Sequence, residues 1–124
     1  MAEAVTILAV DQNPRNLVLM QAFLEKNGYQ VETAGTLEAV DRALLGRRAI
    51  RLALIDIAGF DRGIWERCER IRDARIPFLV IFPQQHAALQ EESLEHGAQG
   101  TLTKPLAQQQ LLGLISGLLG EEEG

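Results

Sequence analysis

Short apolar runs alternate with amphipathic segments about five times along the chain, and this alternation constrains the fold more than any other feature. The runs 5–10, 52–56 and 78–82 are almost continuously apolar, as expected for strands of a parallel sheet that are buried on both faces. Residues 29–34 alternate between apolar and polar, and residues 100–103 form only a short segment. Both segments are predicted to be further strands of the same sheet.

The segments between these runs have helical spacing and helix-end signals. Asn13 and Pro14 are typical of a helix start, and Gly28 of a left-handed helix end. Further helices are predicted from Thr36 and over about 63–74, 86–96 and 107–119. Five strands that alternate with five helices predict an α/β fold, a doubly wound five-stranded parallel sheet between two helical layers.

Composition excludes several classes of protein. The 124 residues fit one domain over 1–120, with an acidic and frayed tail at 121–124. No run is long enough to span a bilayer, and the amino terminus lacks the pattern of a signal peptide. The only cysteine, Cys68, excludes a disulfide framework, and its helical spacing with apolar residues indicates core packing. We therefore expect a cytoplasmic protein without a membrane contact.

Charge is distributed unevenly over the sequence. The net charge is −5, which argues against direct binding of nucleic acid by the whole surface. Residues 42–75 nevertheless hold nine arginines against five acidic residues. Most of these charges are expected to form a solvated helix face with internal pairs such as Glu66 and Arg70. The alternative is a docking surface for an acidic partner.

Three charged residues follow the predicted strands at their carboxyl ends. Asp11 and Asp56 each end a buried apolar run, and Lys104 follows the fifth strand. In such sheets ligands bind at this edge. Two carboxylates and one lysine suit Mg²⁺ and a phosphoryl group, with a carboxylate as the acceptor of the phosphate.

These residues, with the segments 7–11, 54–56, 76–77, 97–98 and 102–105, resemble the receiver domain of two-component response regulators over residues 5 to about 119. The resemblance implies a flavodoxin-like (βα)5 fold and phosphorelay signalling with a histidine kinase as partner. It makes Asp56 the phosphoacceptor and Lys104 the contact to the phosphoryl oxygens. Asp11, Asp56 and the carbonyl of Ala58 would face the metal. The Lys104–Pro105 bond is often cis in this family.

Three positions depart from the family pattern. Gln12 replaces the acid that normally binds the metal directly, so Mg²⁺ binding is expected to be weak or absent. Phe82 stands where the family has a switch Ser or Thr, and Thr101 stands where it has an aromatic switch residue. The loop after Asp56 is also altered. We therefore expect an atypical receiver with impaired phosphorylation of Asp56.

The residues leave alternative interpretations open. The chain could be a pseudo-receiver that does not depend on phosphorylation and acts as an interaction or dimerisation module. Lys104 could then be a structural counterion, and Phe82 could be core filling or a lock on one switch state. A small enzyme on this fold has no support beyond the fold itself, so at most self-phosphotransfer onto Asp56 is expected.

The last helix has an unusually wide apolar surface. No charged residue occurs between Pro105 and Gly120, and the leucines and one isoleucine cover an arc of about 160°. We expect this excess to be buried in a homodimer or against an output domain through the fourth helix, fifth strand and fifth helix, with Leu112 and Leu119 at the interface. Trp65 is expected in the core or at an interface, whereas His86 and His96 are expected in solvent.

Overall fold

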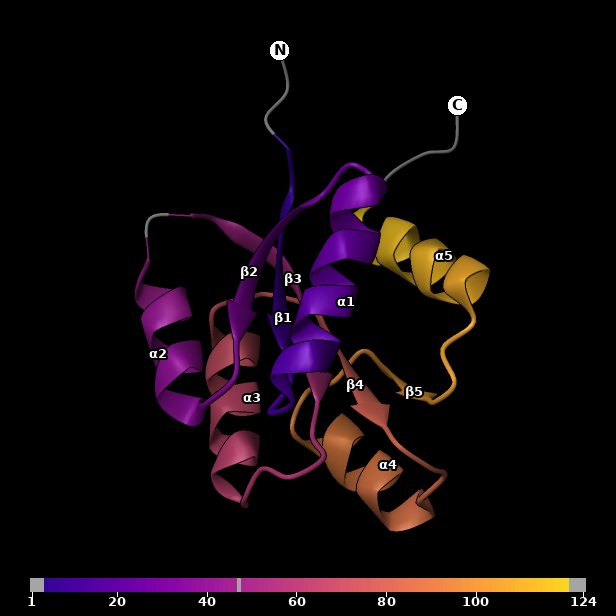
Figure 1. Ribbon diagram of the computed structural model, residues 1–124. Coiled ribbons are helices and arrows are strands. Elements are labelled where there is room, and N and C mark those ends of the chain that lie inside the picture. The colour runs from indigo at the N-terminus through magenta and orange to yellow at the C-terminus, as the bar shows by residue number, and fades with distance from the viewer. Residues whose placement is uncertain (1–3, 47, 121–124) are drawn as a thin grey trace.

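The computed structural model describes residues 4–46 and 48–120 and contains five strands and five helices in strict alternation (Figure 1). Their order and bounds are β1 (Thr6–Val10), α1 (Pro14–Lys26), β2 (Gln30–Ala34), α2 (Leu37–Leu45), β3 (Ile50–Asp56), α3 (Gly63–Asp73), β4 (Phe78–Phe82), α4 (Ala87–Glu95), β5 (Gly100–Thr103) and α5 (Gln108–Leu119). The predicted α/β fold is confirmed. The acidic tail expected at 121–124 lies outside the described residues.

The five strands form one parallel sheet in the order β2-β1-β3-β4-β5. Every carboxyl end therefore points to the same edge of the sheet, which is the lower edge in Figure 1. The chain first moves outward from β1 to β2 and then crosses to β3 on the other side of β1. The order reverses at β1 and β3, and ligand sites of doubly wound sheets lie at such a reversal.

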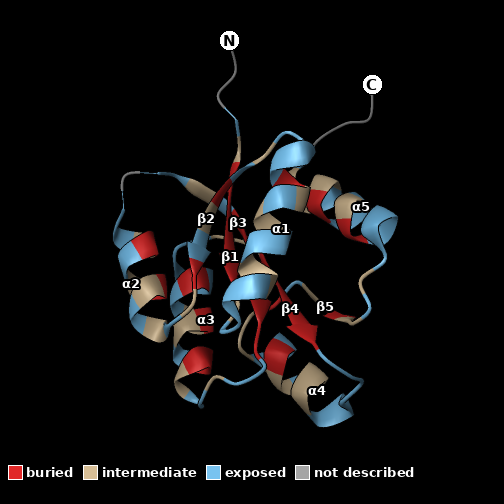
Figure 2. Cartoon of the chain, in the orientation of Figure 1, coloured by how far each residue is buried: buried red, intermediate tan, exposed pale blue. Residues whose placement is uncertain are grey.

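Two apolar clusters hold the helices against the sheet. One contains Val40 of α2, Cys68 of α3 and the aromatic residues Phe78 and Phe82 of β4. The other joins the opposite sheet face to α1 and α5, with Leu24 as an example. The central strands are buried over almost their whole length (Figure 2). The unbroken apolar runs thus reflect burial on both faces.

Local signals explain most helix boundaries. The side chain of Asn13 accepts hydrogen bonds from two backbone amides of the first turn of α1, and Thr36 caps α2 through the amide of Ala39. Strand β3 begins two residues earlier than predicted, at Ile50. The register between β1 and β3 shifts here, because Thr6 is paired with Ile50 and Ile7 with Leu52, which leaves Arg51 as an extra residue. Within the described ranges, no helix is long and apolar enough to cross a membrane.

The ion pair expected within a helix face is present, but one expectation about a histidine is wrong. Glu66 and Arg70 pair at 2.7 Å on α3. His96 was predicted to lie in solvent, whereas its ring stacks on Trp65 with 5.1 Å between the ring centroids. Its Nδ1 atom lies 2.5 Å from a carboxylate oxygen of Glu69. Trp65 itself is buried, so α3 and the end of α4 are joined by an aromatic and polar contact.

Candidate functional site

Asp11, Asp56 and Lys104 meet at the carboxyl edge of the sheet, as the sequence predicts. Asp56 is the last residue of β3, Asp11 follows β1, and Lys104 follows β5. All three line the same open hollow together with residues of the first and third βα loops. Because β1 and β3 are neighbours, the two carboxylates face one another across adjacent strand ends.

Asp56 is almost completely buried, and both of its carboxylate oxygens have partners. The residue is 3% exposed. Its Oδ2 atom lies 2.6 Å from Nζ of Lys104, and its Oδ1 atom accepts a hydrogen bond of 3.0 Å from the backbone N–H of Ala58. A buried carboxylate needs such compensation, because an uncompensated one costs several kcal/mol, about 3–5 when a partner is removed. Lys104 therefore compensates the buried negative charge of Asp56.

Asp11 occupies a less favourable environment for a charge. Its Oδ1 atom accepts a hydrogen bond of 2.9 Å from the backbone N–H of Asn13. Burial raises the pKa of the Asp11 carboxyl, and the nearby charge of Asp56 raises it further, while the hydrogen bond from Asn13 and the charge of Lys104 lower it. The net effect is a raised pKa. A cation bound between Asp11 and Asp56 would relieve their repulsion.

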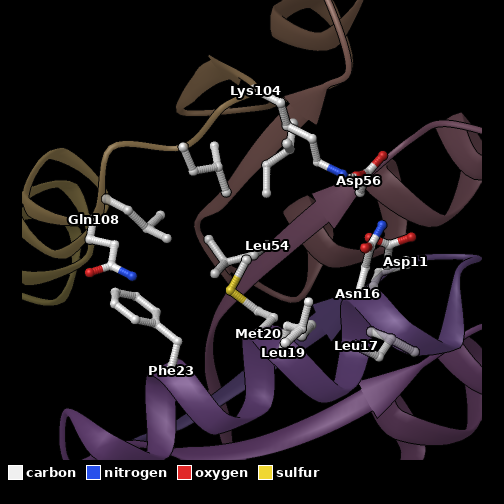
Figure 3. A pocket seen from close by; sticks show the side chains of 15 residues that line it. Asp11, Asn16, Leu17, Leu19, Met20, Phe23, Leu54, Asp56, Lys104 and Gln108 are labelled. Carbon is white, nitrogen blue, oxygen red and sulfur yellow. Dashed lines mark ion pairs between the residues drawn. The ribbon is translucent and has the colours of Figure 1, made fainter.

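The backbone around Lys104 fixes the lysine at the rim of the site. Its N–H donates a hydrogen bond of 2.9 Å to the carbonyl of Phe82, which ties the end of β5 to the end of β4. The Lys104–Pro105 peptide bond is cis, as the resemblance implies. The side chain then reaches across the end of β4 to Asp56 (Figure 3).

Gln12 turns its side chain toward the loop that follows Asp56. A Cβ atom placed on Gly59 would stand 1.9 Å from the Oε1 atom of Gln12. The amide thus lies against the loop backbone at the rim of the hollow that holds both aspartates. No group of three His, Cys, Asp or Glu side chains suited to a metal occurs in the described part of the chain. A hard cation would therefore rely on two carboxylates, on carbonyl oxygens and on water.

A second hollow lies beside Asp56 between α1 and α5, with a volume of about 210 Å³ (Figure 3). Its walls are mostly apolar and include Met20 and Phe23 of α1, while Asn16 and Gln108 add polar groups. Neither Asn16 nor Gln108 was predicted from the sequence as a site residue. Asn16 has one sequence signal, because it stands three residues after the cap Asn13 and so points back toward the strand ends.

The two residues predicted to stand at altered switch positions lie in different surroundings. Phe82 is fully buried among apolar residues of the cluster beneath α2, α3 and α4. Thr101 is half-buried on the edge strand β5 and is paired with Val80 rather than with Phe82. It lines a hollow next to α4 and α5, separate from the hollows that contain Asp56.

The apolar surface of α5 is partly used within the chain. Leu111 and Ile115 are buried, and Leu119 packs partly buried against the same cluster. Leu112 is half-buried, and Leu114 is 37% exposed. Part of the apolar arc of α5 is therefore already buried within the chain and is not free to contact a partner.

Comparison with known proteins gives consistent results. Residues 7–116 match the family model of the response regulator receiver domain. The chain is 32% identical over 117 residues to the signal transduction histidine-protein kinase BarA of Escherichia coli K12. The aligned region covers 90% of this chain but only 12% of BarA. The chain therefore spans about an eighth of the length of this curated relative.

Solved structures agree in fold. A CheY-like response regulator receiver domain protein from Methanospirillum hungatei JF-1 matches with a TM-score of 0.83 and 27% identity, covering 95% of each chain. A response regulator from Thermotoga maritima matches with a TM-score of 0.83 and 21% identity, covering 96% of this chain and all of the other. The second match shows the fold alone.

Proposed function

Because the chain belongs to the response regulator receiver domain family, we propose that it accepts a phosphoryl group on Asp56, with reduced efficiency, and signals through the face formed by α4, β5 and α5. The observation that carries this proposal is the buried carboxylate of Asp56, paired with Lys104 at 2.6 Å and facing Asp11 across adjacent strand ends. These three residues are the charged groups that phosphoryl transfer to a carboxylate requires.

Receiver domains interact with histidine kinases in two-component phosphorelay signalling and are generally not enzymes, although they can phosphorylate themselves. BarA, which this chain resembles, is itself a histidine kinase. The partner proposed for this chain is accordingly a histidine kinase or another signalling protein that presents a phosphohistidine.

The chemical step is a transfer of one phosphoryl group. A carboxylate oxygen of Asp56 attacks phosphorus, the P–N bond of the phosphohistidine breaks, and the electron pair of that bond remains on the imidazole nitrogen. The product is an acyl phosphate on Asp56. Lys104, already in contact with the carboxylate, neutralises charge on the phosphoryl oxygens as the bond forms.

Receiver domains typically bind Mg²⁺ at this site. The residues present fit the ion incompletely. Asp11, Asp56 and the carbonyl of Ala58 offer hard oxygen ligands, and Mg²⁺ accepts water at its remaining positions. Gln12 contributes a neutral amide that lies against Gly59, so this site has two carboxylates where the family pattern has three. Weak Mg²⁺ binding follows, because ligand charge drives the binding of hard cations.

A second candidate function is a pseudo-receiver that binds its partner without phosphorylation. The fully buried ring of Phe82 favours it, since the hydroxyl that normally joins the phosphoryl group to loop movement is replaced by an apolar side chain fixed in the core. In this case Lys104 serves as the structural counterion of Asp56, and the α4–β5–α5 face has one conformation.

The deciding experiment treats the protein with acetyl phosphate and Mg²⁺ and measures its intact mass, and separately titrates it with beryllofluoride while following the fluorescence of Trp65. Trp65 is the only tryptophan and lies against His96 at the end of α4, so its emission reports on that helix. A phosphorylated mass and a saturable Mg²⁺-dependent fluorescence change, both lost in Asp56→Asn, are expected. Neither response at millimolar Mg²⁺ would instead favour the pseudo-receiver.

Dimerisation through α5 is a separate part of the proposal. Leu112 is half-buried and can contribute surface to a partner, whereas Leu119 also packs within the chain. Sedimentation of wild-type protein and of Leu112→Glu distinguishes the cases, with a Gln109→Glu variant on the exposed part of the same helix as control. A dimer that is lost only in Leu112→Glu supports the interface. A monomer at high concentration contradicts it.

A further inference from the structure

Two arginines stand at irregular backbone positions on the edge of the sheet opposite the candidate phosphorylation site. Arg51 is the second residue of β3, and Arg75 lies between α3 and β4. Both are exposed. Ala53 of β3 is paired with Phe78 of β4. Arg51 within β3 and Arg75, three residues before β4, therefore both lie toward the amino ends of two neighbouring strands.

Arg75 has a backbone conformation that normally selects glycine. Its φ is +62°, the only positive value of a non-glycine residue in the described chain. The N–H of Ile76 donates to the carbonyl of Ile71, so Arg75 is the left-handed residue that ends α3. At the ends of α1, α4 and α5 the left-handed residue is a glycine: Gly28, Gly97 and Gly120. An arginine there adds strain without any visible benefit to folding.

Arg51 is placed by a second irregularity. The register shift between β1 and β3 leaves Arg51 without a partner residue on β1. Such an extra residue bends its strand and changes the direction of a side chain. Neither Arg51 nor Arg75 forms an ion pair with another described residue, whereas the acidic neighbour Asp73 is already paired with Arg72.

The geometry points to a docking surface formed by Arg51 and Arg75, which binds an acidic segment of a partner protein. Arginine binds carboxylates through two parallel hydrogen bonds, and two exposed guanidinium groups on adjacent strand ends suit two successive carboxylates. This surface lies at the amino ends of the strands, far from Asp56, so it is independent of the proposed phosphorylation.

A short acidic peptide suits the surface formed by Arg51 and Arg75 better than a long polyanion does. The protein has a net charge of −5. At this edge Glu25 and Asp73 each stand beside a basic residue, Lys26 and Arg72. Nucleic acid or an anionic membrane would extend beyond the two arginines over a protein whose overall charge repels it. A short acidic segment can contact the two arginines alone.

The test measures the binding of a fluorescent octaglutamate peptide to the full chain by fluorescence anisotropy at low ionic strength. Arg75→Gly and Arg51→Gln are each expected to weaken binding roughly three- to tenfold, as expected for the loss of one charge-assisted contact. The control is Arg15→Gln, an exposed arginine at the opposite edge with no ion pair to a described residue, which removes the same charge. If all three variants bind the peptide equally less tightly, or if the wild type does not bind it, the proposed docking surface is contradicted.

Arg75→Gly also separates binding from folding. Glycine accepts a positive φ without strain, so this variant is expected to unfold at higher urea concentration than wild type while it binds the peptide less well. A lower unfolding midpoint would mean that Arg75 serves the fold, and the proposal would fail. Tighter binding of DNA or of anionic vesicles than of the peptide would likewise contradict it. A third outcome would also contradict the proposal. If the peptide binds only after Glu121, Glu122 and Glu123 are changed to glutamine, the acidic end of the chain itself competes for the two arginines.

Discussion

The side-chain amide of Gln12 lies directly against the backbone of Gly59, with its Oε1 atom 1.9 Å from the position that a Cβ atom would take. Gly59 has a φ of +84°, which an L side chain adopts only with strain. The two residues therefore join the loop after β1 to the loop after β3 at the rim of the hollow around Asp56.

We predict that Gly59→Ala destabilises the protein by the cost of its backbone conformation and moves the side chain of Gln12. A left-handed alanine costs about 1–2 kcal/mol, whereas its methyl group meets Oε1, the far end of an exposed and flexible side chain. Gly28→Ala is the matched control, since Gly28 has a φ of +93° and nothing within 4 Å of its Cβ position. Urea unfolding of both variants is expected to show similar losses. A much larger loss in Gly59→Ala that Gln12→Ala relieves would contradict this prediction.

Asp11→Asn is predicted to stabilise the protein at neutral pH. Burial and the charge of Asp56 raise the pKa of Asp11 in the folded state, so the ionised form is less favourable there than in the unfolded chain. The wild type therefore gains stability relative to the variant as pH falls through the raised pKa toward the ordinary value of 3.8. Asparagine keeps an oxygen for the N–H of Asn13. Unfolding free energies of both proteins between pH 3 and pH 7 give the comparison, and a less stable variant at pH 7 would refute it.

The sequence was sufficient to predict the sheet and the convergence of Asp11, Asp56 and Lys104. Each follows a buried apolar run, and parallel strands bring all their carboxyl ends to one edge whatever the loops do. The caps Asn13 and Thr36 were also predictable, because capping depends on residues within one helical turn. These features need only local pattern and topology.

Contacts between distant segments were not predictable in this way. The stacking of His96 on Trp65 joins residues 31 positions apart and depends on how α3 and α4 pack. Gln12 meets Gly59 across two separate loops, and the place of Arg51 depends on a shift in strand register. In each case the decisive quantity is the relative position of two elements, which residue periodicity does not contain.

Asp41→Asn is predicted to cost stability in a way that depends on pH. The carboxylate of Asp41 on α2 bonds Arg67 through two nitrogens at 2.9 and 3.2 Å and Arg70 at 2.8 Å, both on α3. The hydrogen bond from Arg67 is the main cause of a lowered Asp41 pKa. The ionised carboxylate of Asp41 therefore adds to the free energy of unfolding above its ordinary pKa of 3.8. This stabilisation is lost as pH falls through the lowered pKa of the folded state.

The measurement is the difference in unfolding free energy between wild type and Asp41→Asn as a function of pH and salt. The difference is expected to be constant near neutrality and to shrink below about pH 4. Asp73→Asn is the control, because Asp73 pairs with Arg72 between two well-exposed side chains and such pairs contribute little. If both variants behave alike, the link between α2 and α3 is no stronger than an ordinary surface pair.

Phe82→Thr is predicted to weaken the fold and at the same time to strengthen the response to phosphorylation. The ring of Phe82 is fully buried, so its removal leaves a cavity that costs about 3 kcal/mol or more. The new hydroxyl stands at the end of β4, beside Lys104, whose N–H bonds the carbonyl of residue 82. Phe82 and Trp65 line the same hollow beneath α4, so loop movement there reaches the tryptophan.

Urea unfolding and the beryllofluoride response of Trp65 fluorescence test the two halves of this prediction. Thr101→Ala is the control, since Thr101 lies on the edge strand away from that hollow and its loss is expected to change stability by less than about 1 kcal/mol. A larger fluorescence change in Phe82→Thr than in wild type supports the view that the ring holds one switch state. An unchanged response, despite a measured loss of stability, would mean that Phe82 fills the core without governing the switch.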